Sequence, residues 1–300
     1  TPSTLLMVKP QHFGYNPETA KTNTFQKELK PNGISLSDLA IQEYDSAVKK
    51  IRETGIEVLS FEGNQKEIIP DAIFPNNWVG FHPNKMAILY PMTHHNRRLE
   101  RNSEVLDFVK NSGHVFNELI DLSGYEKENL FLEGTGSMVF DYKNKWVYGC
   151  ISPRTSLKLF TKVAGLLNVK PISFTASDTK GNLIYHTNVI LTITEKLAII
   201  CLDCIGNELE RVSIIDELKN SNLEIISISQ NQVTQFAGNL FEVKNPSGKS
   251  YLIGSETAWD AFTKHQLETI KSFHHPLKLS IPTIETVGGG SARCMLAGVY

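Results

Sequence analysis

A cysteine near the carboxyl end of the sequence has the surroundings of a nucleophile. Cys294 follows three consecutive glycines in the segment GGGSARCML. A glycine-rich loop exposes backbone N–H groups, and these groups, with Arg293 nearby, would stabilise a thiolate and a negative charge that develops on a substrate. A buried structural cysteine in a C-terminal strand explains the segment equally well.

A histidine and an asparagine enter an apolar segment together. YHTNVILTI alternates in polarity, so we predict a strand in which His186, Asn188, Ile190 and Thr192 share one face. A polar pair at the start of such a strand suits a site at the end of a sheet. The chain has nine histidines, and for any one of them an ordinary core or surface position is the simpler interpretation.

A carboxylate stands directly before a break in another apolar segment. In FLEGTGSMVFD, two glycines interrupt the pattern just after Glu133, which predicts an interrupted strand. A buried carboxylate next to an imidazole would orient the ring and assist proton transfer. The alternative is an exposed glutamate at a turn.

A proline interrupts the segment PDAIFPNNWVGFHP and predicts a shaped loop that leads into the strand WVGF. Asp71, Asn76 and Asn77 in this loop could form hydrogen bonds with a planar ligand, and Phe74 could pack on its alkyl part. Considered alone, the loop would be an asparagine-rich turn.

The elements that must position these residues recur about five times along the chain. Each unit has two short β-rich segments, a helix and a further β segment. The helices are expected near Ser37–Glu53, Arg97–Lys110, Ser156–Leu167, Glu208–Lys219 and Glu256–Phe273. Repeated strand-strand-helix-strand units predict an α/β propeller with its loops gathered at a common axis. Two α/β domains without symmetry are the alternative. No linker divides residues 1–300, so we expect a single domain.

Composition excludes several classes of partner. The formal net charge is only −2 and no long basic stretch occurs, so we expect no nucleic acid and instead a small neutral or zwitterionic ligand. The apolar stretches are far shorter than the roughly 20 residues that cross a bilayer, so we expect no membrane partner. Thr1–Lys9 lacks the features of a secretion signal, so we expect a cytoplasmic protein. The oligomeric state, homo-oligomers included, is left open.

Cysteine usage points away from disulfides and metals. Four cysteines are too few for a disulfide scaffold in 300 residues. Cys201 and Cys204 form a C-x-x-C inside the apolar segment LAIICLDCI without a second ligand pair, so we interpret them as buried thiols at the end of a strand.

Together, the four polar segments resemble the active-site set of the penteins, which include arginine deiminases, dimethylarginine hydrolases and amidinotransferases. The resemblance extends from LLMVKPQHFGYN to the last ten residues. It implies a five-bladed pentein propeller, with Cys294 as the nucleophile, His186 as the general acid/base and Glu133 as the assisting carboxylate. It also implies a hydrolase that needs no metal or organic cofactor.

The same resemblance implies the substrate-binding residues. Asp71 matches the aspartate that holds side-chain nitrogens of the substrate. Arg154 in ISPRTS and, less firmly, Arg97 in HHNRRLE match arginines that grip the α-carboxylate of an amino acid, for which a guanidinium fork is the apt geometry.

Two departures from the arginine-acting penteins concern the substrate. Asn77 and Asn188 stand where those enzymes usually carry carboxylates. A guanidinium offers only N–H donors, whereas a neutral ureido group also has an acceptor oxygen that an amide can serve. FPNNW, EGTGSMVFD and GGGSARCM look most similar to citrulline-utilisation hydrolases, so we predict hydrolysis of citrulline to ornithine, carbon dioxide and ammonia. The alternatives are a guanidino hydrolase, deiminase or amidinotransferase acting on arginine or a derivative, and a non-catalytic ribosome-binding pentein.

Overall fold

Each predicted repeat forms its own small sheet. In the computed structural model, which describes residues 1–29, 33–63 and 68–300, the described residues form five sheets of three strands each. In every sheet one strand pair is antiparallel and the other is parallel. The strands are β1 (Thr4–Val8), β2 (Glu57–Phe61) and β15 (Ala297–Val299); β3 (Val79–His82), β4 (Met86–Leu89) and β5 (Glu118–Asp121); β6 (Met138–Asp141), β7 (Trp146–Cys150) and β8 (Lys170–Phe174); β9 (Leu191–Ile193), β10 (Leu197–Ile200) and β11 (Glu224–Ser227); and β12 (Phe241–Lys244), β13 (Ser250–Ser255) and β14 (His275–Leu279).

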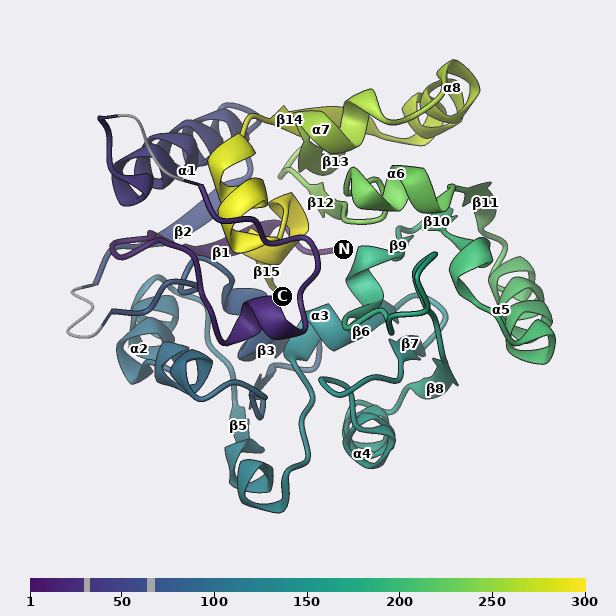
Figure 1. Ribbon diagram of the computed structural model, residues 1–300, viewed down its shortest axis with the longest axis horizontal. Helices are drawn as coiled ribbons and strands as arrows, with labels where there is room; N and C mark the ends of the chain where they lie inside the picture. Colours follow the sequence, from purple (N-terminus) through teal and green to yellow (C-terminus); the bar gives the residue numbers. More distant parts are fainter. Residues whose placement is uncertain (30–32, 64–67) are drawn as a thin grey trace.

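A helix connects the two parallel strands of each sheet, as a parallel crossover requires. These helices are α1 (Leu36–Arg52), α2 (Ser103–Asn111), α4 (Leu157–Leu166), α5 (Glu208–Asn220) and α8 (Lys264–Phe273). Figure 1 shows the sheets side by side around the middle of the molecule, with the crossover helices on the outside. The observed fold is therefore α/β with repeated strand-helix units, as predicted.

Two of the five helices were predicted as continuous, but each is divided into two by an N-cap residue inside the predicted range. The segment expected as Arg97–Lys110 is a 3₁₀ helix, η3 (Asn96–Glu100), followed by α2, because the Asn102 side chain accepts a hydrogen bond from the Glu104 N–H and starts a new helix. The segment expected as Glu256–Phe273 is divided into α7 (Glu256–Asp260) and α8, because Thr263 and Gln266 form a capping box. The other three helices lie within one residue of their expected ends.

The repeat is also visible in the backbone. Between the crossover helix and the third strand, a residue with positive φ recurs in four units, at Gly55, Gly113, Asn168 and Asn222. Glycine and asparagine are the residues that most readily end a helix in this left-handed conformation. The same local solution at the same place identifies the units as structurally equivalent.

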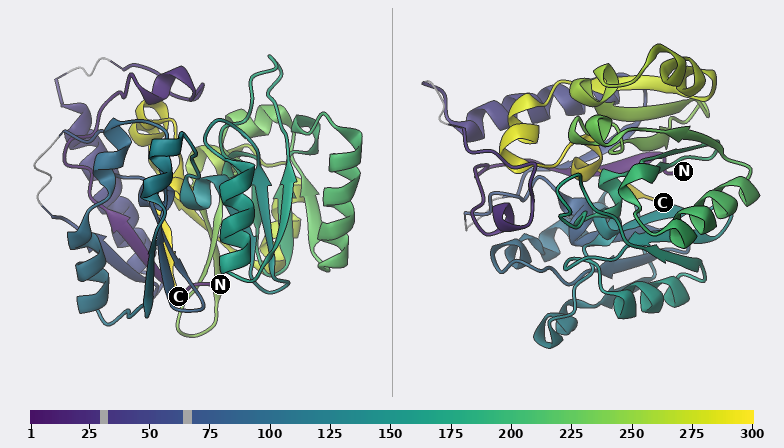
Figure 2. Two further views of the ribbon diagram at one scale, coloured as in Figure 1. Left: turned by 90° about the horizontal axis from the view of Figure 1, so that it is seen from below. Right: turned by 45° about the vertical axis from the view of Figure 1, so that its right-hand side comes forward.

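The two ends of the chain complete one sheet together. β15 pairs antiparallel with β1, with Thr4 opposite Val299, and both termini lie on the same side of the molecule (Figure 2). The segment that carries Cys294 is thereby tied to the first sheet rather than left as a free tail.

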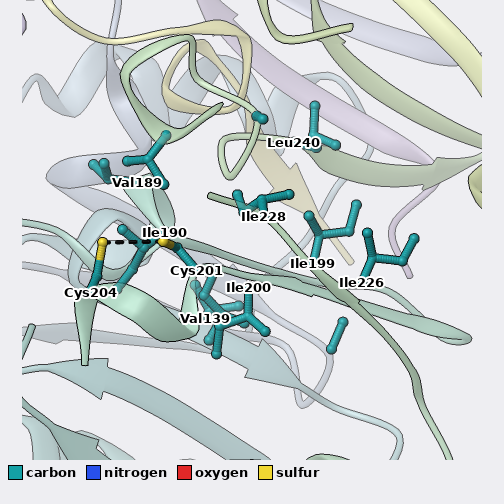
Figure 3. Close-up of a cluster of buried hydrophobic side chains, with 14 of the residues drawn as sticks. Val139, Val189, Ile190, Ile199, Ile200, Cys201, Cys204, Ile226, Ile228 and Leu240 are labelled. Carbon is teal, nitrogen blue, oxygen red and sulfur yellow. Dashed lines mark hydrogen bonds between the residues drawn. The ribbon is translucent and has the colours of Figure 1, made fainter. Parts of the chain in front are cut away.

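Apolar side chains from neighbouring sheets pack together between them. Figure 3 shows part of one such cluster, in which Val139 of β6, Ile199 of β10 and Ile226 of β11 are buried together. The same view includes Cys201 and Cys204, which are free, buried thiols whose sulfurs lie 3.3 Å apart in a hydrogen bond. Their interpretation as buried thiols is confirmed.

The described ranges contain neither a candidate membrane span nor a candidate metal site. No helix there is long and apolar enough to cross a membrane. No group of three or more His, Cys, Asp and Glu side chains there is arranged to hold a metal ion.

Candidate active site

Seven of the ten predicted site residues line one small pocket: Asp71, Phe74, Asn77, Arg97, Arg154, His186 and Cys294. The other three, Glu133, Asn76 and Asn188, lie behind that wall and are completely buried. Residues more than 200 positions apart in sequence therefore converge at a single site, as the resemblance to the penteins implied. The cavity has a volume of only about 20 Å³, roughly enough for one water molecule.

The sulfur of Cys294 lies among side-chain amides. Cys294 belongs to a short 3₁₀ helix, η8 (Ala292–Met295), and is 8% exposed. The Nδ2 atoms of Asn188 and Asn239 lie 3.7 Å and 3.4 Å from its Sγ. Its own backbone N–H donates to the Ser291 carbonyl, so this N–H is not free for a ligand. The donors next to the thiol are thus largely side chains and not the glycine loop alone.

His186 and Glu133 form a buried pair. The His186 Nε2 lies 2.8 Å from Glu133 Oε2, and the Thr93 N–H donates to the other carboxylate oxygen. Glu133 stands at the start of the one-turn helix α3 (Gly134–Ser137), which is the break that its two glycines predicted.

The predicted strand through His186 and Asn188 is wrong at its start. Residues Thr187–Val189 form a 3₁₀ turn, η5, and β9 begins only at Leu191. The Thr187 hydroxyl anchors this turn by donating to the Ser137 carbonyl and accepting from the Cys150 N–H. This side-chain bonding replaces ladder bonding, and it directs both His186 and Asn188 toward the site.

Burial and the neighbouring charges set the protonation states of this pair. Burial lowers the pKa of His186 to about 4, against the opposing effect of Glu133. Burial alone would raise the pKa of Glu133, but Arg154 and His186 hold it well below its usual range. At neutral pH the imidazole is therefore neutral and the carboxylate ionised. The ionised Glu133 accepts the hydrogen on Nε2, which leaves Nδ1 as the basic nitrogen.

Asp71 presents one free carboxylate oxygen. Its Oδ2 accepts hydrogen bonds from Asn16 Nδ2 at 2.6 Å and Thr19 Oγ1 at 3.3 Å, whereas Oδ1 is buried and has no partner among the described residues. Burial raises the pKa of Asp71, and Arg97 opposes that shift. A buried unpartnered oxygen at the pocket wall can accept an N–H from a ligand.

Arg97 is committed to protein partners. Its Nε and Nη2 donate to the two oxygens of Glu100 at 2.7 Å and 2.9 Å, and its Nη1 donates to Asn77 Oδ1 at 3.0 Å. Because the carbonyl oxygen of Asn77 faces a donor, the amide orientation is fixed and its Nδ2 remains without a described partner. The geometry makes Arg97 an orienting group for Asn77, and leaves little of its fork for a substrate carboxylate.

Arg154 retains a free donor. Its Nη2 donates to the Thr22 hydroxyl at 2.5 Å and the Thr19 carbonyl at 3.3 Å, and its Nη1 lies 3.6 Å from Glu133 Oε2. Its Nε has no partner within the described ranges. The guanidinium also lies 4.8 Å from the centre of the Tyr185 ring.

Phe74 and Asn76 take supporting positions. The Phe74 ring lies against Gly288 and Gly290, so it packs on the glycine loop as well as lining the pocket. Asn76 is absent from the pocket wall, and its backbone carbonyl accepts a hydrogen bond from the Thr135 hydroxyl. Its side-chain amide is buried, and neither Nδ2 nor Oδ1 has a partner among the described residues.

Sequence patterns did not reveal several residues of the site. Asn16, Thr19 and Asn23 come from an irregular N-terminal segment, and Asn239 precedes β12. Their polar side chains look like ordinary turn residues in the sequence. The only signal was the clustering of Asn and Thr in the segment between Asn16 and Gln26, whose side chains bond Asp71 and the carbonyls of the glycine loop.

Comparison with known families identifies the family of the chain. The family model for N,N-dimethylarginine dimethylhydrolase, eukaryotic, matches residues 9–300. The chain belongs to this family and, with it, to the pentein superfamily. A comparison with curated protein sequences found no match.

Solved structures show the same fold at low identity. An arginine dihydrolase of the cyanobacterial ornithine-ammonia cycle has a TM-score of 0.74 at 16% identity, with 99% of this chain and 40% of that chain covered. Its N-terminal domain with substrate bound has a TM-score of 0.73 at 17% identity and 99% and 97% coverage. A dimethylarginine dimethylaminohydrolase adduct with S-methyl-L-thiocitrulline has a TM-score of 0.65 at 10% identity and 99% and 100% coverage. The chain therefore spans less than half of the full-length dihydrolase.

Proposed function

We propose that the protein is a cysteine hydrolase that cleaves citrulline to ornithine, carbon dioxide and ammonia. The family and the neighbours support a hydrolase that acts on guanidino-type C–N bonds. The proposal adds the ureido substrate, the roles of the individual residues, and a single domain over residues 1–300 whose sheets close into a propeller. We place this enzyme in the cytoplasm.

The observation that carries the choice of citrulline is the set of buried atoms without partners. Among the residues that line the pocket or contact the thiol, four such atoms occur in the described part of the chain. Arg154 Nε is assigned below to the α-carboxylate, and the other three are the Asn77 Nδ2 donor and two acceptors, Asp71 Oδ1 and Asn188 Oδ1. A ureido group has one acceptor oxygen and several N–H donors, so it matches one donor and two acceptors. A guanidinium would leave the Asn77 donor unpaired, which costs free energy in a buried site.

The reaction begins when Nδ1 of the neutral His186 takes the proton of the Cys294 thiol and the resulting thiolate attacks the ureido carbon. His186 donates a proton to the departing nitrogen, and Asn77 Nδ2 stabilises the negative oxygen of the tetrahedral intermediate. A covalent thioester-like intermediate remains on the sulfur. His186 then removes a proton from water, the resulting hydroxide attacks the same carbon, and the C–S bond breaks to regenerate the thiolate, which His186 reprotonates. The carbamate that leaves still carries the second nitrogen, and its loss of carbon dioxide breaks the remaining C–N bond and frees that nitrogen as the amine.

The amino-acid end of the substrate is assigned to Arg154. Its free Nε and its two Nη groups can receive the α-carboxylate once the contacts with Thr19 and Thr22 are exchanged. Because the present cavity is too small for an amino acid, the residues that line it must move apart when the substrate enters.

Product analysis tests the substrate. Purified protein incubated with citrulline should release ornithine, and incubated with arginine should release far less product. Citrulline formed from arginine, with no turnover of citrulline, would reverse the assignment. That outcome would favour a second candidate, a guanidino hydrolase, which the family model and the arginine dihydrolase structures make the nearest rival.

Two cysteine variants, one at Cys294 and one at another buried thiol, test the identity of the nucleophile. Cys294→Ala should lower kcat by at least about 10³-fold, as removal of a nucleophile generally does, whereas Cys204→Ala, a change at another buried thiol, should retain activity. Mass spectrometry after rapid quenching should find the substrate fragment on Cys294. Full activity of Cys294→Ala would refute the role. Absence of any activity in the native protein would favour a non-catalytic binding pentein.

A further inference from the structure

We infer that Asn239 is a further catalytic residue, which contacts the reacting sulfur and stabilises its ionised form. The inference rests on the proposed role of Cys294 as the nucleophile. The Asn239 side chain is 1% exposed and directed at the thiol of Cys294.

The Asn239 amide can serve the sulfur in both of its protonation states. Its Nδ2 lies 3.4 Å from Cys294 Sγ, and its Oδ1 lies 3.6 Å from the same atom. The oxygen can accept the S–H hydrogen of the thiol, and the nitrogen can donate to the thiolate. The Asn239 amide can therefore form a hydrogen bond with the sulfur before ionisation, during attack and after release, without a change of rotamer.

Asn239 also connects the sulfur to Asn188, the other asparagine whose side chain lies next to Cys294. The Asn239 Nδ2 also donates to the backbone carbonyl of Asn188 at 2.9 Å. With two hydrogens, Nδ2 has one for this carbonyl and one for the sulfur. Because Asn188 follows His186 closely in the chain, the bond also fixes the turn that carries the imidazole.

The backbone around Asn239 is held in an unusual conformation. Phe236 has φ +61°, a left-handed value that is rare for an aromatic residue. The Asn239 N–H donates to the Phe236 carbonyl at 2.8 Å. Strained residues of this kind persist where the surrounding structure imposes them, and they cluster at functional sites.

Two neighbours impose this conformation. Gly238 lies so close to the Val189 carbonyl that a Cβ atom could not be accommodated there. The Thr192 hydroxyl donates to the Gly238 carbonyl at 2.8 Å and accepts from the Leu240 N–H at 3.1 Å. These contacts hold the loop against β9 on both sides of Asn239. They thereby fix the position of the Asn239 amide next to the sulfur.

The test compares four proteins: the native protein, Asn239→Asp, Asn239→Ala and a control variant, Asn231→Asp. Aspartate keeps the shape of the side chain but removes the donor and adds a negative charge next to the sulfur. Asn231 lies on α6 (Gln230–Thr234), is exposed, and undergoes the same chemical change away from the thiol. The readout is the rate of alkylation of Cys294 by iodoacetamide at pH 7, which requires no substrate.

We expect alkylation to slow about tenfold in Asn239→Ala, the effect of one hydrogen bond to a charged group, and further in Asn239→Asp because of charge repulsion. Asn231→Asp should react as the native protein does. Equal rates in all four proteins, with melting temperatures showing that they are folded, would overturn the inference. If Asn239→Asp does not fold, the Ala variant alone decides by the same criterion.

The readout also separates this inference from the choice of substrate. Slowed alkylation in a protein that does not hydrolyse citrulline would support Asn239 and refute the proposed function. Citrulline turnover with an unchanged alkylation rate in the Asn239 variants would support the proposed function and refute the role of Asn239.

Discussion

Two sides of the pocket are built from different chemistry. On the ion-pair side, Arg97, Glu100, Glu133 and Arg154 are mutually bonded or in contact. On the amide side, Asn77, Asn188 and Asn239 surround the thiol or face the cavity, and two of them keep a polar atom without a described partner.

The difference separates positioning from recognition. A buried charge is tolerated when it is paired and hydrogen-bonded, so most donors of the ion-pair side are engaged within the protein. The exception is Arg154 Nε, the free donor assigned to the α-carboxylate of the substrate. A buried amide with one unpartnered atom costs much less, and that atom is available to a ligand. Arg97 connects the two sides, because its bidentate bond to Glu100 leaves Nη1 to fix the orientation of Asn77.

The strongest test of the difference between the two sides is to replace an amide of the amide side with a carboxylate. Asn188→Asp should lower kcat/KM for citrulline about 100-fold, because a buried carboxylate then faces a neutral group, and should raise activity on arginine relative to citrulline, because a guanidinium can pair with it. Steady-state kinetics on both substrates provide the measurement.

Asn231→Asp is the matched control for this change and should leave both rates as they are. An Asn188→Asp enzyme that keeps the native preference for citrulline would show that the amide side does not select the substrate.

A smaller effect is expected from crowding the boundary between the two sides. A Cβ at position 136 would meet Asn77 Nδ2 and His186 Nδ1 at distances that real structures do not show. Gly136→Ala should therefore displace both groups, lower kcat about tenfold, and destabilise the protein by about 1–3 kcal/mol, the usual range for overpacking.

Gly165→Ala, in α4, is the control, because nothing lies within 4 Å of its new Cβ. This variant should keep full activity and gain about 0.5–1 kcal/mol from helix propensity. Thermal melting and steady-state rates measure both effects. Native kcat in Gly136→Ala would contradict the proposed closeness of the imidazole to the reaction.

The last prediction concerns the effect of pH on stability. Burial lowers the pKa of His186 and His94 to about 4 and that of His82 to about 3, whereas an unfolded histidine titrates near 6.5. Between these values the unfolded chain binds more protons, so stability should fall as pH decreases from about 6.5 to about 4, by up to about 1.4 kcal/mol per pH unit for each histidine.

The ion-pair side behaves differently, because the lowered pKa of Glu133 keeps that carboxylate ionised below its usual range. Its stabilising contribution is lost only at still lower pH. Denaturant unfolding at several pH values gives the profile. A free energy of unfolding that stays constant between pH 6.5 and 4.5 would show that these imidazoles are not buried in the neutral form.

Part of the site could be predicted because its signals are local. The breaks after Glu133 and around Pro75, and the glycines before Cys294, are visible in short segments. The resemblance to the penteins connected them, and the structure brings them to one pocket. Arg97 was predicted to bind the α-carboxylate of a substrate, whereas in the structure it lines the pocket with its guanidinium bonded to Glu100 and Asn77. This pairing could not be predicted, because Glu100 is only one of several nearby acids and the choice depends on burial.

By itself the sequence determined the repeat, because hydrophobic periodicity and helix-ending Gly and Asn residues act over a few positions. It also determined which functional groups were available for the site. Only the tertiary structure decided which of those groups meet. Asn239 and Cys294 are 55 positions apart, and Asn188 and Cys294 are 106 apart. Contacts of this kind depend on how whole sheets pack, and no local pattern encodes which unpaired amide will face the sulfur.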